Sequence, residues 1–125
     1  MQLRIQELEG LVDSSGIIAF LRRPEENAPP EYISEGIGAF GYKPEDFTSG
    51  KVTFRELIHP EDADRAYLEL TENALEGAAE HRQTYRIRTK KEHVRIVEER
   101  TTIMRDENGK VLYYQGMLED ITDRK

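Results

Sequence analysis

The chain has 125 residues, a formal net charge of −7 and a 34% share of charged residues. This length favours one domain, and the acidic balance disfavours nucleic acid and anionic membrane surfaces as partners, because both attract clustered cations. The absence of cysteine excludes disulfides, thiol catalysis and cysteine-ligated metal sites. No apolar run approaches the roughly 20 residues of a membrane helix and no signal-peptide pattern opens the chain. We therefore expect a cytoplasmic domain, and a membrane anchor elsewhere in a parent protein stays open.

Residues 1–14 are predicted to form an amphipathic helix, because Ile5, Leu8 and Val12 recur at helical spacing. A helix of this length is marginal alone in water, so its apolar face needs a partner. Two partners stay open, the sheet of the same domain and a second copy of the chain.

The next stretch predicts two strands separated by a loop. The run 17–21 is short, apolar and β-branched at its start, which is typical of a buried strand. The prolines of 22–30 exclude regular strand pairing there, and 31–34 is predicted to be a short second strand.

The middle of the chain predicts helices. Residues 34–48 should form small helical turns, the first capped by Ser34 and the next begun by Pro44. A short turn is predicted at 54–58, and a longer helix should begin at Pro60 and end at Gly77. The apolar stripe of that helix consists of Ala63, Ala66, Tyr67, Leu70 and Ala74.

The last third of the chain predicts strands at 84–88, 94–104 and 111–118. Alternation in the first of them puts Tyr85 and Ile87 on one face and the neighbouring arginines on the other. A hairpin over 106–109 leads into the last strand, and its Asn-Gly pair suits a type I′ turn. Strands at both ends around a helical middle predict an α+β domain.

Three short motifs are distinctive. The stretch 41–47 reads G-Y-K-P-E-D-F, residues 59–62 read H-P-E-D, and the chain closes on G-x-x-x-D-I-T-x-R-K after a D-E-N-G hairpin. Together they resemble the motifs of PAS sensory domains, and the resemblance extends from Gly16 to the end. The closing signature consists of Gly116, Asp120, Ile121, Thr122, Arg124 and Lys125.

The resemblance implies a PAS fold, a five-stranded antiparallel sheet with short helices and one longer helix on one face, preceded by an N-terminal amphipathic helix. It divides the chain into a flanking helix at 1–14, a PAS domain at 15–119 and the start of an output linker or helix at 120–125. It also implies a homodimer with a downstream output domain in the same chain, in a signalling parent such as a sensor histidine kinase of a two-component system.

The chain departs from the family pattern at two places. Ile96 stands where the family often has tryptophan, and Lys91-Glu92-His93 replaces a usual Asp-Gly turn. The geometry of that turn is therefore open, while the fold assignment is not affected.

Few residues have the pattern of a reaction centre. His59, beside Glu61 and Asp62, could act as a general base, but we predict that it caps the long helix. His81 and His93 lack the spacing of metal ligands, so neither a catalytic nor a metal site is predicted.

Two cofactor chemistries of the family are not expected. Haem-binding PAS domains hold iron through a histidine on the long helix, and residues 61–76 contain none. Photoreceptors of the light-oxygen-voltage type form a flavin–cysteine adduct, and the chain has no cysteine. The identity of any ligand, including a noncovalent flavin, stays open.

The remaining candidate site is a cavity between the sheet and the helices. The alternative is that the same side chains fill a solid core. Tyrosine hydroxyls among them would need a partner, either a ligand or another side chain. The predicted wall consists of Ile18, Phe20, Ile37, Phe40, Phe54, Ile58, Tyr67, Tyr85, Ile87, Tyr114 and Leu118.

Three functions stay in competition. The first is a sensory or regulatory module that transmits a signal through Asp120, Ile121 and Thr122, or that mediates dimerisation. The second is a constitutive dimerisation or docking domain without ligand. The third, a small α+β cone enzyme, needs an acid or base in an apolar cavity. The strand faces predict apolar or tyrosine side chains there, with the carboxylates at helix starts and turns.

Overall fold

The computed structural model describes residues 17–124 of the chain. The predicted N-terminal helix, with Ile5, Leu8 and Val12, lies outside the described residues, as does Lys125. Among the described residues, no helix combines the length and apolarity that crossing a membrane requires.

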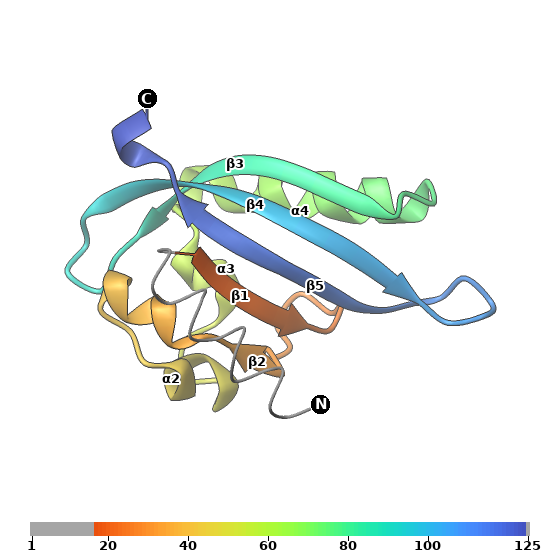
Figure 1. Cartoon of the computed structure of the whole chain (residues 1–125), viewed down its shortest axis with the longest axis horizontal. Helices are drawn as coiled ribbons and strands as arrows, with labels where there is room; N and C mark the ends of the chain where they lie inside the picture. Colours follow the sequence, from red (N-terminus) through yellow and green to blue (C-terminus); the bar gives the residue numbers. More distant parts are fainter. Residues whose placement is uncertain (1–16, 125) are drawn as a thin grey trace.

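One antiparallel sheet of five strands forms the centre of the domain, in the order β2-β1-β5-β4-β3. Each neighbouring pair is antiparallel, so the predicted α+β class and sheet are confirmed. Figure 1 shows the long helix α4 crossing the sheet behind β3 and β4. The strands are β1 (Ile17–Arg22), β2 (Tyr32–Ile33), β3 (Glu80–Arg88), β4 (Val94–Arg105) and β5 (Val111–Asp120).

Helical segments connect the two halves of the sheet and cover its inner face. Inward side chains alternate along the strands, as Tyr85 and Ile87 do on β3, and pack against the buried faces of these helices. A second, smaller cluster around Leu70 and Ile103 continues the core toward the end of α4. These segments are η1 (Glu35–Phe40), α2 (Pro44–Thr48), α3 (Phe54–Leu57) and α4 (Pro60–Leu75), and a further short segment, η2 (Thr122–Arg124), follows β5.

The long helix begins and ends where the sequence predicts. His59 is its N-cap, and its Nδ1 accepts a hydrogen bond from the N–H of Glu61 at 3.1 Å. The predicted capping role of His59 is therefore confirmed. Gly77 follows the helix with a φ of 92°, a left-handed conformation that glycine adopts without a Cβ clash.

Asp62 fastens the start of α4 to β3. Its Oδ2 accepts hydrogen bonds from the backbone N–H and the Nε of Arg86, at 2.8 and 3.0 Å, and its Oδ1 accepts from Nη2 at 2.8 Å. The hydrogen bonds from Arg86 lower the pKa of Asp62 from 3.8 to about 2. The last residue of the H-P-x-D motif, Asp62, therefore has a structural role, because it joins α4 to a strand that is distant in sequence.

Ser34 occupies the predicted N-cap position of η1, but without the predicted side-chain bond. Its side chain makes no capping bond to η1, and its Oγ instead accepts the N–H of Ala19 at 2.9 Å. Ser34 is completely buried beside β1, where an unpaired strand N–H would be costly, so its hydroxyl is used there.

The hairpin between β4 and β5 also differs from its prediction. The N–H of Gly109 donates to the carbonyl of Asp106, so Glu107 and Asn108 are the central residues of the turn. Only Gly109 in this loop has a positive φ, of 84°, whereas a type I′ turn needs positive φ at both central residues. The Asp106 carboxylate accepts the N–H groups of Asn108 and Lys110, which holds this other geometry.

The turn between β3 and β4 is closed without glycine. Glu92 adopts a φ of 67°, the one positive value of a non-glycine residue in the described part of the chain. Thr89 compensates through its carbonyl, which accepts from Glu92, and its Oγ1, which accepts from His93.

Candidate functional site

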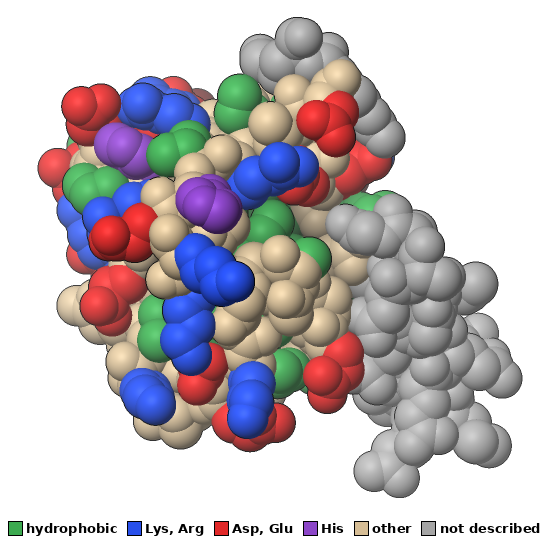
Figure 2. All heavy atoms as spheres, turned by 90° about the vertical axis from the view of Figure 1, so that its left-hand side faces the viewer, with side chains coloured by type: hydrophobic (Ala, Val, Ile, Leu, Met, Phe, Trp, Pro, Cys, Tyr) green, Lys and Arg blue, Asp and Glu red, His purple; other side chains and the backbone are tan. Residues whose placement is uncertain are grey.

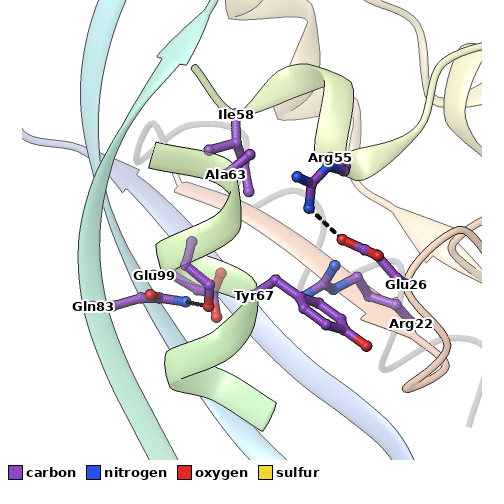
Figure 3. Close-up of a pocket in the computed structure, with 9 residues that line it drawn as sticks. Arg22, Glu26, Arg55, Ile58, Ala63, Tyr67, Gln83 and Glu99 are labelled. Atoms are coloured by element: carbon purple, nitrogen blue, oxygen red, sulfur yellow. Dashed lines mark hydrogen bonds and ion pairs between the residues drawn. The ribbon is translucent and has the colours of Figure 1, made fainter. Parts of the chain in front are cut away.

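A small cavity of about 30 Å³ lies between the inner face of the sheet and helices α3 and α4 (Figure 3). Its wall mixes small apolar side chains with charged and amide groups, which is unusual for the interior of a domain. The lining residues are Arg22, Glu26, Arg55, Ile58, Ala63, Ala66, Tyr67, Gln83 and Glu99.

Glu99, on β4, brings a carboxylate into the core, where it is 1% exposed. The hydroxyl of Tyr85 donates to its Oε1 at 2.7 Å, and that of Thr101 donates to its Oε2 at 2.7 Å. Burial is the main cause that raises the pKa of Tyr85 well above its ordinary value, and the adjacent Glu99 is the second cause. Tyr85 therefore stays protonated and serves as a hydrogen-bond donor. Both carboxylate oxygens of Glu99 thus accept a hydrogen bond within the core.

Arg22 ends β1 and presents its guanidinium to the cavity. The guanidinium carbon lies 4.1 Å from the ring centroid of Phe54 and 5.5 Å from that of Phe20. Cation–π attraction at such distances holds the positive charge against an apolar wall. Its Nε is buried and has no hydrogen-bond partner among the described residues.

Gln83, on β3, contributes a side-chain amide of which only one polar atom has a hydrogen-bond partner among the described residues. Its Nε2 donates to the carbonyl of Ala66 on α4 at 3.2 Å. Its Oε1 is buried and finds no donor within residues 17–124. The cavity therefore has one unpartnered donor, on Arg22, and one unpartnered acceptor, on Gln83.

Arg55 closes the side of the cavity that faces solvent. Its guanidinium pairs with Glu26 from the loop after β1 and with Asp64 on α4. Outside this contact lies an open groove of about 480 Å³ that shares Glu26, Arg55 and Tyr67 with the cavity. Figure 3 shows Arg55 and Glu26 meeting above Tyr67, so these side chains separate the cavity from the groove.

The predicted cavity wall is placed mainly in the packed core. Ile58 and Tyr67 line the cavity, whereas Tyr114 belongs to the smaller core cluster. The other predicted wall residues pack in the main cluster, and they are Ile18, Phe20, Ile37, Phe40, Phe54, Tyr85, Ile87 and Leu118.

Sequence reasoning missed the polar wall. The expectation that carboxylates stay at helix starts and turns is wrong at Glu99. A signal was present, because Gln83 shares its strand face with Tyr85, and Glu99 shares its face with Val97. Strict period-two reading would have placed both polar side chains inward.

The predicted signal exit forms a hydrogen-bonded junction between β4 and β5. Oδ1 of Asp120 accepts from the N–H and Oγ1 of Thr122, at 2.9 and 2.6 Å, and its Oδ2 accepts from Nε of Arg95 at 2.8 Å. The N–H of Ile121 donates to the carbonyl of Ile96, whose own N–H donates to Oγ1 of Thr122. Burial alone would raise the pKa of Asp120, but these hydrogen bonds lower it below its ordinary value.

The surface offers no concentrated charge of one sign on the face that Figure 2 presents. Basic, acidic and histidine side chains alternate there. Within residues 17–124, no three His, Asp or Glu side chains converge in the manner of metal ligands.

Comparison with known proteins gives concordant results. The family described as PAS fold matches residues 31–118. The methyl sulfide methyltransferase-associated sensor of Methanosarcina acetivorans is 44% identical over 119 residues, which are 95% of this chain and 12% of the relative. The chain thus spans a small part of that relative's length.

Solved structures share the same architecture. The N-terminal domain of a diguanylate cyclase with PAS/PAC sensor from Marinobacter aquaeolei has a TM-score of 0.73 at 21% identity, over 86% of this chain and 97% of the other. A sensory box histidine kinase/response regulator from Burkholderia thailandensis has a TM-score of 0.72 at 22% identity, over 94% and 86%. Since the family match covers well over half of the chain and the sheet has the same fold, the chain belongs to the PAS fold family.

Proposed function

We propose that the domain is a sensory module in which a change at the cavity is transmitted to an output domain through the end of β5. The observation that carries the proposal is that one strand, β4, contributes residues both to the cavity and to the junction at the end of β5. Glu99 of β4 lines the cavity, and Arg95 and Ile96 of the same strand hold the junction, roughly 10–15 Å away along the strand.

The register between β4 and β5 supplies a direct path. Glu99 lies opposite Leu118, and Val97 lies opposite Asp120. A displacement of Glu99 would strain the pairing of these strands, and the hydrogen bonds of Asp120 and Thr122 lie next along the ladder. A switch needs states that differ by only a few kcal/mol, which is the size of a few such bonds.

The parent that best suits this module is a sensor histidine kinase acting in a two-component system. A 44% identical relative is named a sensor, and a structurally similar chain is named a sensory box histidine kinase. In such a parent the partners of the domain are a second copy of the chain and the output domain that follows Lys125.

The relay through the junction is testable by substitution. Asp120→Ala and Thr122→Ala each remove cap-like hydrogen bonds worth about 0.5–2 kcal/mol. We expect the domain to stay folded, because domains hold about 5–15 kcal/mol, while the ratio of output states shifts about 2- to 30-fold. The measurement compares basal and stimulated kinase output with the melting temperature, in the chain joined to its output domain.

The matched control is Thr102→Ala, which removes an exposed threonine from the outer face of β4. It should leave output unchanged. Normal signalling in both junction variants, or unfolding that explains all of the lost signal, would show that the junction is only structural.

A second prediction concerns assembly. The apolar positions Ile5, Leu8 and Val12 lead us to propose that residues 1–14 join two copies of the chain. Deleting residues 1–12 should shift the domain from dimer toward monomer in light scattering. The same mass with and without the segment would contradict the proposed dimer contact.

A docking domain without ligand is the second candidate, and the size of the cavity favours it. A cavity of about 30 Å³ has room for roughly two water molecules, because one needs about 10–15 Å³ of such space. Native mass spectrometry of the purified chain separates the sensory module from the docking domain, because it reports bound ligand and oligomeric state together.

The cone-enzyme alternative gains a buried acid in Glu99, yet hydroxyl donors already occupy both of its oxygens.

A further inference from the structure

The outer side of α4 carries two exposed leucines. Leu68 is 53% exposed and Leu75 is 82% exposed, the highest values among the large hydrophobic side chains of the described residues. They lie two helical turns apart, so both project from one face of the helix. A single exposed leucine is ordinary, but two at heptad spacing are typical of a helix that packs against another helix.

The last turns of α4 also place carboxylates where a helix disfavours them. Glu72 and Glu76 are four positions apart, so their like charges repel across one turn. The carbonyl end of a helix attracts cations, yet the last turn of α4 contains no basic residue. Arg105 donates to the carbonyls of Ala74 and Ala78 at that end, but neither glutamate has an ion pair within residues 17–124.

These two unfavourable features coincide on one face of α4. Glu72 lies between Leu68 and Leu75 at helical spacing, and Glu76 flanks them. Exposed apolar groups and repelling carboxylates both weaken the domain when it is alone. A surface that breaks local rules without a compensating contact is expected to have a function. A partner that brings apolar side chains and positive charge together relieves both features at once.

Each leucine borders a hollow of the surface. Leu68 lines the groove of about 480 Å³ outside Arg55. Leu75 and Thr71 line a second groove of about 380 Å³, which Pro24 bounds on the side of the loop after β1. Two packed helices insert the side chains of one between those of the other, and these hollows provide the room for such insertion.

An extended peptide suits this region less well than a helix, because side chains of α4 already bond the free edge of β3. Asp62 accepts the backbone N–H of Arg86, and Nη2 of Arg65 donates to the carbonyl of Thr84 at 3.1 Å. A peptide that adds to a sheet needs such edge groups for its own backbone hydrogen bonds. The side chains of α4 are what remains available to a partner.

The charge of α4 selects among the possible occupants. The helix has Arg65 as its one cation, against the acids Glu61, Asp62, Asp64, Glu69 and Glu72. A second copy that presented its own α4 would bring like charges together, and an anionic membrane would be repelled in the same way. A helix with basic residues beside its apolar stripe is attracted instead.

We propose that the outer face of α4 docks an amphipathic helix of a partner protein, with lysines or arginines flanking its apolar stripe. The docking face consists of Leu68, Thr71, Glu72, Leu75 and Glu76. Because it spans only two turns, the interface is small and the contact is transient, as in many signalling encounters. The inference goes beyond the proposed relay and does not depend on it.

The test is a titration of the 15N-labelled chain with a synthetic helical peptide, followed by NMR. The peptide has three heptads with leucine at a and d, lysine at e and g, and alanine elsewhere. It should produce saturable shifts of backbone amides centred on Leu68, Glu72 and Leu75. The same peptide with glutamate in place of lysine should bind at least about tenfold more weakly.

Two substitutions in the docking face have matched controls elsewhere. Leu75→Ser removes the more exposed leucine, and Val94→Ser makes a similar change at a 48% exposed position of β4. Glu72→Lys reverses one charge, and Glu107→Lys makes the same reversal in the exposed hairpin after β4. Binding of the lysine peptide should fall about tenfold or more in Leu75→Ser and in Glu72→Lys, and stay unchanged in both controls.

Melting temperatures separate lost binding from lost folding. Glu72→Lys should melt at the same temperature as the unaltered chain or above it, because it removes the repulsion with Glu76 and adds a cation near the carbonyl end of α4. Leu75→Ser should melt almost unchanged, because its side chain is mostly in solvent. Weaker binding by a variant that is at least as stable is not expected of a purely structural residue.

Absence of saturable shifts, equal binding of the two peptides, or unchanged binding in Leu75→Ser would overturn the inference. Two further results would assign the face to another occupant and overturn it as well. A dimer that Leu75→Ser converts to monomer in light scattering would assign the face to a second copy. Peptide binding that appears only after residues 1–12 are deleted would assign it to the N-terminal segment of the same chain.

Discussion

Replacing Gly116 with alanine should lower the free energy of unfolding by about 3 kcal/mol or more, at or beyond the upper end of overpacking costs. A Cβ at this position would lie 2.4 Å from the carbonyl oxygen of Arg100 and 2.7 Å from Cζ of Phe20. The nearer atom is backbone of the adjacent strand, so relief requires β4 and β5 to separate, not merely a side chain to rotate. The glycine that opens the closing signature thus has a steric reason, because Phe20 crosses over it.

The measurement is urea unfolding at neutral pH, with Gly38→Ala as the matched control. A Cβ at Gly38 meets nothing within 4 Å, and its φ is not in the left-handed region. That substitution should be neutral or stabilise by up to about 1 kcal/mol, because alanine loses less chain entropy on folding. Equal effects of the two substitutions would contradict the steric account of Gly116.

The fold could be predicted from the sequence because its elements carry strong local signals. The alternation of Tyr85 and Ile87 fixed the inner face of β3, and His59, Pro60 and Gly77 marked the ends of α4. Predictions failed where a side chain had a distant competitor for its hydrogen bond. Ser34 has the chemistry of a cap, but the N–H that it meets belongs to β1.

The candidate site was less predictable, because its chemistry depends on pairs that the sequence does not bring together. Tyr85 and Glu99 meet only through the pairing of β3 with β4. Arg22 follows an apolar run and looks like the first residue of a loop, yet the aromatic wall draws its guanidinium inward. The closing motif identified Asp120. Its partner Arg95 could not be identified from the sequence, because the two residues meet only when β4 pairs with β5 and Val97 comes to lie opposite Asp120.

Acid should weaken the domain through one carboxylate, that of Asp62. Its pKa is about 2 in the folded chain against 3.8 ordinarily, and each pKa unit is worth 1.36 kcal/mol, so the group contributes about 2 kcal/mol. Because the folded pKa is the lower one, this contribution is complete above about pH 4 and is lost as the pH falls toward about 2. The side chain of Asp62 is 12% exposed and that of Arg86 is 39% exposed, so solvent screens the contact in part and about 2 kcal/mol is the upper end of the contribution.

Asp62→Asn should therefore cost up to about 2 kcal/mol at pH 7 and flatten the pH dependence of unfolding between about pH 4 and pH 2. Urea unfolding across that range measures both effects. Asp64→Asn is the matched control on the same helix, since Asp64 pairs with Arg55 but is 82% exposed, and such a pair contributes about 0–1 kcal/mol. If the Asp62→Asn variant lost stability in acid as strongly as the unaltered chain, protonation of Asp62 would not be the cause of the acid sensitivity.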